Sequence, residues 1–595
     1  MTTTVERQPS RFRALEERTL CAAFQTTARD FADRPAVRTK GDEVSFTWRE
    51  YADRVRRLAA GLAGLGVERG RTVALMLTNR PEFHFVDAAA MHLGATAFSI
   101  YNTYATEQIE HLLRDAETTV VVTEAAFLDR VMKVRAACPH LEHVVDVDCS
   151  GRDGTLTLDE LARRAPEDFD FEATWRAVEP DDTLTLIYTS GTTGPPKGVQ
   201  LTHANILAAG HSSDEVISFP PESRVVSYLP MAHIAERICS HYLPALFGTT
   251  VTCCGNPREV LAYLPDVRPT WFFAVPRIYE KLKAAIEAGA DPATREAIEV
   301  GLRKVRAEQA REPVSEELRA EWERADREII ARIREDLGLD ELQGLNVGAA
   351  PTPREVIEFF HALGLPLAEL WGMSETTGAG TCNRPGEIKI GTVGPPSPGV
   401  EVKLADDGEV LVRSKVNMKG YRNDPEKTRE TIDADGWLHT GDIGEFDDDG
   451  YLKIVDRKKE LIINAAGKNM SPANIEAKLK VASELIGQAI CIGDARPYNV
   501  ALIVLDPDFA PVFARRNGIE NASLAELASH PKVVEEVAAG VDRANEQLAR
   551  VEQIKKFCIL PTDWEPGGDE LTPTMKLKRK PIAAKYAEEI EALYA

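Results

Sequence analysis

The sequence has no paired cysteine motif and no long apolar run. Its nine cysteines include no C-x-x-C pair, and the adjacent Cys253 and Cys254 have poor geometry for a shared zinc site, so we expect buried, reduced thiols. No uninterrupted apolar stretch of about 18 residues is present, and the N-terminus shows no apolar signal core. These absences argue against a disulfide scaffold and a membrane-spanning protein. They predict a soluble, cytoplasmic protein, peripheral to a membrane at most.

The sequence also lacks an excess of positive charge. Its net charge of −23 argues against a general nucleic-acid-binding protein. A negatively charged nucleotide is still an allowed ligand, because its binding depends on the local field and not on the total charge. The chain of 595 residues is too long for one ordinary core, so we expect about two to four domains.

The hydrophobic pattern predicts an α/β fold. Residues 72–148 alternate short apolar runs, such as TVALML and TVVVTE, with amphipathic stretches, which indicates parallel βαβ units. Residues 277–340 are charged and amphipathic, as in helices that lie outside a sheet with a solvated face. Turn signals crowd residues 386–455 and predict a compact antiparallel β subdomain. We therefore expect a large N-terminal domain, residues 1–455, and a small α+β C-terminal domain, residues 456–595.

A loop rich in glycine and hydroxyls, YTSGTTGPPKG at 188–198, follows the apolar stretch TLTLIY. A strand that runs into such a loop often offers backbone N–H groups to an anion, since glycine permits close approach. The spacing is not that of Walker A, because Pro196 stands where the second glycine would be and Lys197 is followed by Gly198. Taken alone, the loop fits a phosphate site and an ordinary surface turn about equally well, but it does not fit a P-loop kinase or ATPase.

Six motifs in a fixed order carry a resemblance that covers nearly the whole chain. They are YTSGTTGPPKG, YLPMAHIAER (228–237), GAAP (348–351), WGMSET (371–376), a long stretch from DGWLHTGDIG to NMSPANIE (435–476), and PTMKLKRK (573–580). This sequence resembles the adenylate-forming acyl-CoA synthetases, and most of all their long-chain fatty-acid–CoA ligases. The resemblance implies ATP and CoA as co-substrates, Mg²⁺, and two half-reactions. A fatty acid is first activated to acyl-AMP with release of pyrophosphate, and CoA then displaces AMP.

The resemblance also implies a role for each matching residue. The Gly/Thr loop would hold the β- and γ-phosphates, GAAP and Trp371 the adenine, Ser374 the α-phosphate, Glu375 the magnesium ion and Asp442 the ribose. Arg457 would make a second contact with the ribose or with a phosphate. Lys576 would reach the α-phosphate, and Lys576, Glu375, Lys197 and Ser374 form the expected catalytic set. The full nucleotide-binding set is Thr189, Ser190, Gly191, Thr192, Thr193, Gly194, Lys197, Gly348, Ala349, Ala350, Pro351, Trp371, Gly372, Ser374, Asp442, Arg457 and Lys576.

Further residues match the acyl and CoA end of the site and the hinge. The resemblance places His233 at the junction of the acyl pocket and the adenylate, and Gly467 on the face that meets CoA. Lys459, in DRKKE at 456–460, matches the pivot about which the C-terminal domain would rotate as a mobile lid. Two positions depart from the common pattern: Trp371 stands where tyrosine is more usual, and Met575 precedes Lys576 where many relatives have glycine.

Simpler structural roles remain open for several of these residues. His233 fits a packed core histidine equally well, Ser374 and Glu375 fit a helix cap, and Lys576 fits a solvated basic tail. Glu236 and Arg237 fit a simple ion pair. Two rival functions also remain: a fatty-acyl-AMP ligase that loads a carrier protein, and a non-catalytic nucleotide- or lipid-binding relative. The sequence leaves acyl chain length, oligomeric state, pathway and transient membrane contact open.

Overall fold

A seven-stranded sheet forms the N-terminal part of the fold. The computed structural model describes residues 11–189, 195–217, 219–220, 222–464, 469–519, 522–572 and 575–595. The strand order is β17-β8-β7-β4-β3-β5-β6, and β7, β4, β3, β5 and β6 pair in parallel. The strands are β3 (Thr72–Met76), β4 (Thr96–Ser99), β5 (Val120–Thr123), β6 (His143–Asp146), β7 (Thr183–Thr189), β8 (Lys197–Thr202) and β17 (Gly420–Tyr421).

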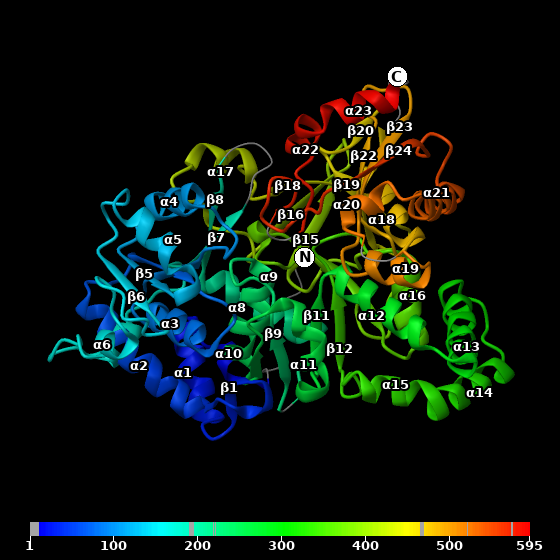
Figure 1. Cartoon of the computed structure of the whole chain (residues 1–595). Coiled ribbons are helices and arrows are strands. Elements are labelled where there is room, and N and C mark those ends of the chain that lie inside the picture. The colour runs from blue at the N-terminus through cyan, green and yellow to red at the C-terminus, as the bar shows by residue number, and fades with distance from the viewer. Residues whose placement is uncertain are drawn as a thin grey trace.

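Helices connect the parallel strands, as expected for βαβ units. The connections are α3 (Pro81–His92), α4 (Thr106–Asp115) and α5 (Ala125–Arg135), which lie in the blue-to-cyan half of Figure 1. Every residue of α3 except Glu82 is buried. The prediction of parallel βαβ units in this region is confirmed.

Two further sheets complete the α/β region. One has the order β2-β1-β10-β9, formed by Ser45–Thr47, Pro35–Thr39, Thr250–Cys253 and Arg224–Ser227. The other has the order β11-β12-β13-β14, formed by Trp271–Ala274, Gly344–Val347, Leu367–Trp371 and Thr381–Cys382. Cys253 and Cys254 are buried and unbridged, as expected.

The charged segment after β11 forms helices at the edge of the molecule. These are α12 (Pro276–Gly289), α13 (Pro292–Gln309), α14 (Glu316–Ala325) and α15 (Ala331–Asp336), and Figure 1 shows α13 to α15 at the lower right. Helix α14 buries none of its residues. The prediction of outer helices with a solvated face is therefore confirmed.

A four-stranded antiparallel sheet follows, in the order β15-β16-β18-β19. Its strands are Val400–Leu404, Glu409–Ser414, Leu438–Phe446 and Leu452–Arg457. This sheet is the β subdomain that the turn signals predict. Its last strand ends at Arg457, so the chain enters the C-terminal part directly from the sheet that carries Asp442.

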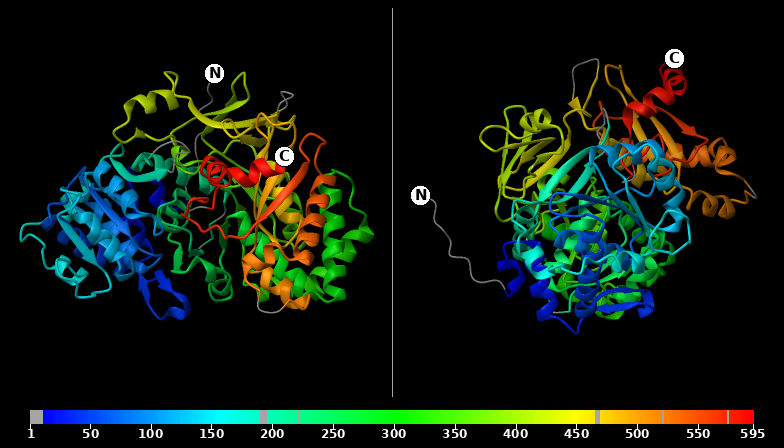
Figure 2. Two further views of the ribbon diagram at one scale, coloured as in Figure 1. Left: turned by 45° about the horizontal axis from the view of Figure 1, so that its top comes forward. Right: turned by 90° about the vertical axis from the view of Figure 1, so that its left-hand side faces the viewer.

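The C-terminal part has its own sheet and its own hydrophobic core. Its sheet has the order β22-β23-β24, formed by Ile486–Ile492, Asn499–Leu505 and Ile554–Leu560. Helices α18 (Pro472–Ala482) and α21 (Pro531–Glu546) contribute Ile475, Leu479, Val533 and Val537 to its main apolar cluster. Figures 1 and 2 show this orange and red unit, with the terminal helices α22 (Arg579–Lys585) and α23 (Ala587–Tyr594), beside the green helices. The exact boundary at 455/456 stays a prediction.

Charged contacts hold the C-terminal unit against α12. Arg277 pairs with Asp506, and the Lys281 ammonium lies 2.6 Å from the Asp508 carboxylate. On another side of the unit, Gly567 lies directly against Thr103 of the N-terminal region. In the described part of the chain, no helix has the length and apolar composition to cross a bilayer.

Candidate active site

The glycine-rich loop connects two paired strands. Strand β7 ends at Thr189 and β8 begins at Lys197, and these two residues face each other in the antiparallel ladder. The expected phosphate-loop residues Ser190, Gly191, Thr192, Thr193 and Gly194 lie outside the described residues. The ammonium of Lys197 lies 3.9 Å from the carboxylate of Asp424 and 5.6 Å from the ring centroid of Tyr421. Lys197 thus lies at the start of β8, next to Asp424 and Tyr421.

Glu375 lies in a short 3₁₀ turn that follows β13. The turn, Ser374–Thr376, is preceded by Met373, so neither Ser374 nor Glu375 occupies its N-cap position. Ser374 and Glu375 are 9% and 8% exposed. One carboxylate oxygen of Glu375 accepts a 2.8 Å hydrogen bond from the Tyr421 hydroxyl. The helix-cap interpretation therefore does not account for this buried carboxylate.

The surroundings of Glu375 suit a magnesium ion that is shared with a nucleotide. Mg²⁺ commonly takes one or two carboxylates together with substrate phosphates and water. The described residues contain no group of three or more histidine, cysteine or acidic side chains that could hold a metal by themselves. Glu375 has one oxygen bonded to Tyr421 and forms no ion pair among the described residues. Its second oxygen could serve such an ion.

Asp442 lies at the centre of a network of polar contacts. It belongs to β18 and is 5% exposed. One oxygen is 2.7 Å from the Arg457 guanidinium, and the other accepts a 2.8 Å hydrogen bond from the indole N–H of Trp371. Burial raises the pKa of the Asp442 carboxyl, while the charge of Arg457 and the indole hydrogen bond oppose that rise. The structure thus brings together three of the expected nucleotide-binding residues.

The GAAP segment lies beside the strand that carries Trp371. It follows β12 directly, and a side chain at Gly348 would come within 2.9 Å of Leu370 in β13. Ala349 has φ +68°, a left-handed conformation that is uncommon for a residue with a Cβ. Such backbone strain is concentrated at functional sites. Ala350 and Pro351 are exposed, and Gly372 is half-buried next to Trp371.

Lys576 lies within electrostatic range of the other site residues. Its side chain is accessible to solvent, yet surrounding protein atoms reduce hydration of the ammonium, and this desolvation lowers its pKa. The charge of Arg457 lowers the pKa further, and the charges of Asp442 and Glu375 oppose it. The backbone N–H of Lys576 donates to the Thr572 hydroxyl at 3.0 Å. Lys576 is therefore not an isolated basic tail.

His233 is close to Lys576 and starts a helix. Its Nδ1 accepts a 3.2 Å hydrogen bond from the N–H of Ala235 at the N-terminus of α9 (Ile234–Arg237). Desolvation, followed by the nearby charge of Lys576, lowers the pKa of His233 to about 3. The imidazole is thus neutral at physiological pH. The place of His233 at the acyl end of the site stays a prediction.

The interpretation of Glu236 and Arg237 as an ion pair with each other is wrong. Glu236 accepts from the Asn79 amide at 3.2 Å and from the backbone of Tyr228 at 3.1 Å. Arg237 is fully buried and pairs with Asp87 of α3. Successive residues on a helix point in different directions, so the side chains of Glu236 and Arg237 contact different partners.

The hinge and CoA predictions rest on the segment after β19. Lys459 is exposed in a turn at 458–460. The preceding Lys458 pairs with Asp407 at 2.5 Å and Glu409 at 3.0 Å in the β subdomain. The following Glu460 binds Arg579 of α22 at 3.2 Å. Lys459 thus lies between Lys458, which contacts the β subdomain, and Glu460, which contacts the C-terminal unit. Gly467 lies outside the described residues.

One site residue escaped sequence reasoning. Tyr421, in GYRNDPEKT, contacts both Glu375 and Lys197, yet its segment reads only as one turn-rich piece of the β region. A tyrosine surrounded by turn residues gives no signal of a phosphate site.

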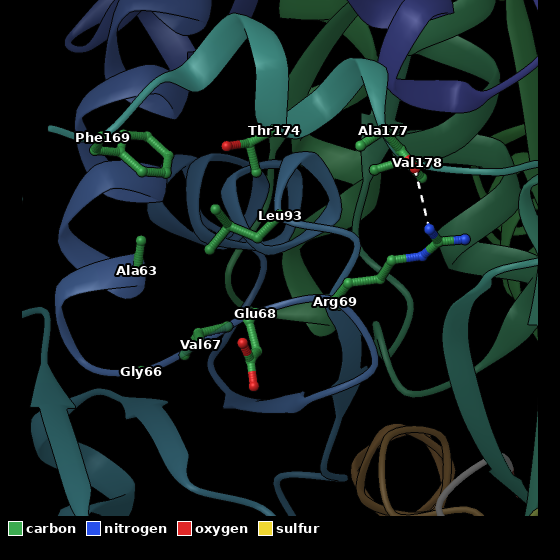
Figure 3. A pocket seen from close by; sticks show the side chains of 10 residues that line it. All are labelled: Ala63, Gly66, Val67, Glu68, Arg69, Leu93, Phe169, Thr174, Ala177 and Val178. Carbon is green, nitrogen blue, oxygen red and sulfur yellow. Dashed lines mark hydrogen bonds between the residues drawn. The ribbon is translucent and has the colours of Figure 1, made fainter.

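A separate cavity of about 340 Å³ is lined by none of the expected site residues (Figure 3). Its lining includes Arg69, which donates to the carbonyl of Ala177 at 3.2 Å.

The fold and the gathered residues define a nucleotide-binding enzyme of two parts, and comparison with known proteins gives its family. The AMP-binding enzyme family matches residues 24–422, and the AMP-binding enzyme C-terminal domain matches residues 459–595. The protein therefore belongs to the AMP-binding enzyme family.

Individual relatives agree over most of the chain. The Mycobacterium tuberculosis protein fadD11 is 53% identical over 451 residues, which cover 74% of this chain and 79% of fadD11. The long-chain-fatty-acid–CoA ligase FadD15 of the same organism is 36% identical over 568 residues, 92% of each chain. The adenylation domain of a carboxylate reductase from Mycobacterium chelonae has the same fold, with a TM-score of 0.76, 23% identity, and coverage of 98% of this chain and 92% of that domain. The expected α/β fold and the family resemblance are both confirmed.

Proposed function

We propose that this protein is a long-chain fatty-acid–CoA ligase that uses ATP and Mg²⁺. In the first half-reaction a fatty-acid carboxylate oxygen attacks the α-phosphorus of ATP and pyrophosphate leaves. In the second, the CoA thiol attacks the acyl carbonyl and AMP leaves. The names of relatives such as FadD15, which aligns over 92% of both chains, support this activity.

The observation that carries the proposal is the contact of Asp442 in β18 with Trp371 of β13 and Arg457 of β19. The charges of Arg457 and Asp442 also act on the pKa of the Lys576 ammonium, although Lys576 is far from both in the sequence. Adenylation brings two anions together, so it needs a cation near the α-phosphate and a polar receptor for the ribose. A carboxylate with two oxygens suits the vicinal diol of the ribose. The arrangement therefore supports the first half-reaction.

We assign the other site residues by the same logic. Lys197 and Thr189 would hold the terminal phosphates, and the GAAP segment and Trp371 would flank the adenine. Glu375 would hold Mg²⁺, which supplies positive charge to the polyphosphate when bound. His233, which is neutral, would line the acyl end. Rotation about Lys459 would remove Lys576 and admit CoA near Gly467. We place the protein in the cytoplasm, with transient contact to a membrane when it takes up its apolar substrate.

The test is mass spectrometry of one reaction. Purified protein, ATP, Mg²⁺ and a mixture of saturated fatty acids are incubated with and without CoA. We expect acyl-CoA only when CoA is present, at chain lengths that the enzyme selects. Acyl-AMP that accumulates in the presence of CoA would favour a fatty-acyl-AMP ligase. If neither product forms, the proposal fails.

A further inference from the structure

Tyr421 contacts both charged side chains that we place at the phosphate end of the site. Its hydroxyl donates to a carboxylate oxygen of Glu375 at 2.8 Å. Its ring centroid lies 5.6 Å from the ammonium of Lys197, a distance typical of a cation–π contact. Tyr421 is half-buried, and one side chain thus touches a carboxylate and a cation that come from different elements.

The backbone around Tyr421 fixes the position of its ring. Strand β17 pairs antiparallel with β8, and Tyr421 lies opposite Val199, two residues after Lys197. The N–H of Tyr421 donates to the Thr428 hydroxyl at 2.9 Å. The N–H of Met418 donates to the backbone carbonyl of Glu375 at 2.8 Å. Residues 418–421 are therefore fixed to strand β8, which begins at Lys197, and to the turn that carries Glu375.

Without such a spacer, Glu375 and Lys197 would attract each other. Two opposite unit charges 4 Å apart gain about 1 kcal/mol in water, and more at a partly buried site. In the described part of the chain they form no ion pair with each other, and Lys197 instead faces Asp424 at 3.9 Å. The Tyr421 hydroxyl occupies one oxygen of Glu375, and its ring faces the ammonium. Neither charged group therefore neutralises the other.

We propose that Tyr421 is a positioning residue that keeps Glu375 and Lys197 apart and presents them separately, the carboxylate to the metal ion and the ammonium to the polyphosphate. The proposal rests on the function proposed above. It assigns the hydroxyl to metal-dependent nucleotide binding and the ring to binding of the phosphates themselves.

Two substitutions separate these roles. Tyr421→Phe removes the hydroxyl and keeps the ring, whereas Tyr421→Leu removes both. Tyr451→Phe is a matched control, because Tyr451 also donates a 2.8 Å hydrogen bond, to the carbonyl of Glu387, and also has a lysine, Lys389, 5.5 Å from its ring centroid. Titration calorimetry with a non-hydrolysable ATP analogue, in Mg²⁺ and in excess chelator, gives the two dissociation constants for each variant.

We expect Tyr421→Phe to reduce the gain in affinity that Mg²⁺ gives by about tenfold, as for loss of a hydrogen bond to a charged group. Its affinity in chelator should match that of the wild type. Tyr421→Leu should weaken binding in chelator as well, and Tyr451→Phe should change neither value. If Tyr421→Phe weakens binding of the ATP analogue equally in Mg²⁺ and in chelator, or does not weaken it, the positioning role is overturned. In that case formation of acyl-CoA by the wild type would show that the proposed function stands. A wild type that neither binds nucleotide nor forms acyl-CoA would overturn both.

Discussion

The indole N–H of Trp371 donates a 2.8 Å hydrogen bond to one carboxylate oxygen of Asp442, while Arg457 contacts the other oxygen at 2.7 Å. A phenylalanine at position 371 could not donate this bond. Trp371 therefore contributes more than the aromatic surface that we propose for adenine. It fixes the orientation of the carboxylate that we expect to receive the ribose.

This relationship predicts that Trp371→Phe weakens ATP binding by about tenfold, because the buried, charged carboxylate of Asp442 loses one of its hydrogen-bond donors. The effect should shrink with 2′,3′-dideoxy-ATP, which has no diol for Asp442. Dissociation constants for both nucleotides, measured for wild type and variant, form the required cycle. The same loss with both nucleotides would assign Trp371 to stacking alone.

Much of the fold was predictable because its signals are local. Alternating apolar runs marked the parallel strands, and clustered turn residues marked the β subdomain around Asp442. Partners across long sequence distances were not predictable. Nothing near Trp371 in the sequence indicates a bond to Asp442, and nothing near Glu236 indicates that its partners are Asn79 and the backbone of Tyr228. Such pairings depend on how strands and helices pack in three dimensions.

Lys576 gives the second prediction. Lys576→Ala should slow acyl-AMP formation by about 10²- to 10³-fold, since it removes the positive charge that we propose for the α-phosphate. Thioester formation from supplied acyl-AMP should persist. Lys580→Ala is the matched control, because Lys580 is an exposed residue of the same basic run, in α22. Single-turnover assays of each half-reaction make the comparison, and equal damage to both would remove Lys576 from the role we propose.

The pH dependence of His233 gives the third prediction. Its pKa of about 3 lies below the ordinary value, so lowering the pH to 5 would protonate roughly 1% of the imidazole. Protonation of His233 should therefore cause no loss of adenylation rate between pH 8 and pH 5. Wild type and His233→Asn should have parallel pH–rate profiles in this range, whatever their absolute rates. An acidic limb that disappears in His233→Asn would contradict the lowered pKa.

Met575 gives the fourth prediction. It has φ +65°, and a left-handed conformation costs a residue with a Cβ about 1 kcal/mol. Met575→Gly should relieve this cost, whereas Met575→Ala keeps it and serves as the control. The strain favours Met575→Gly over Met575→Ala by about 1 kcal/mol in unfolding free energy, and the greater flexibility of unfolded glycine offsets roughly 0.5–1 kcal/mol of that gain. Chemical denaturation should therefore find Met575→Gly at least as stable as Met575→Ala. A Met575→Gly variant that is less stable than Met575→Ala by the full glycine cost would show that the conformation carries no strain.

The contact between Lys281 and Asp508, 2.6 Å apart, should favour the arrangement that brings Lys576 into the site. Both side chains are partly exposed, so the pair contributes about 0.2–1 kcal/mol and weakens with salt. Asp508→Lys replaces this attraction with repulsion, both from Lys281 and near Arg277. We expect it to slow acyl-AMP formation by about two- to fivefold at low ionic strength, and less in high salt. The exchanged pair Lys281→Asp with Asp508→Lys should recover part of the rate. Thioester formation from supplied acyl-AMP should not slow, because in the rotation that we propose the unit leaves α12 for that step. A variant that slows both half-reactions equally, with no dependence on salt, would exclude a role for this pair in domain placement.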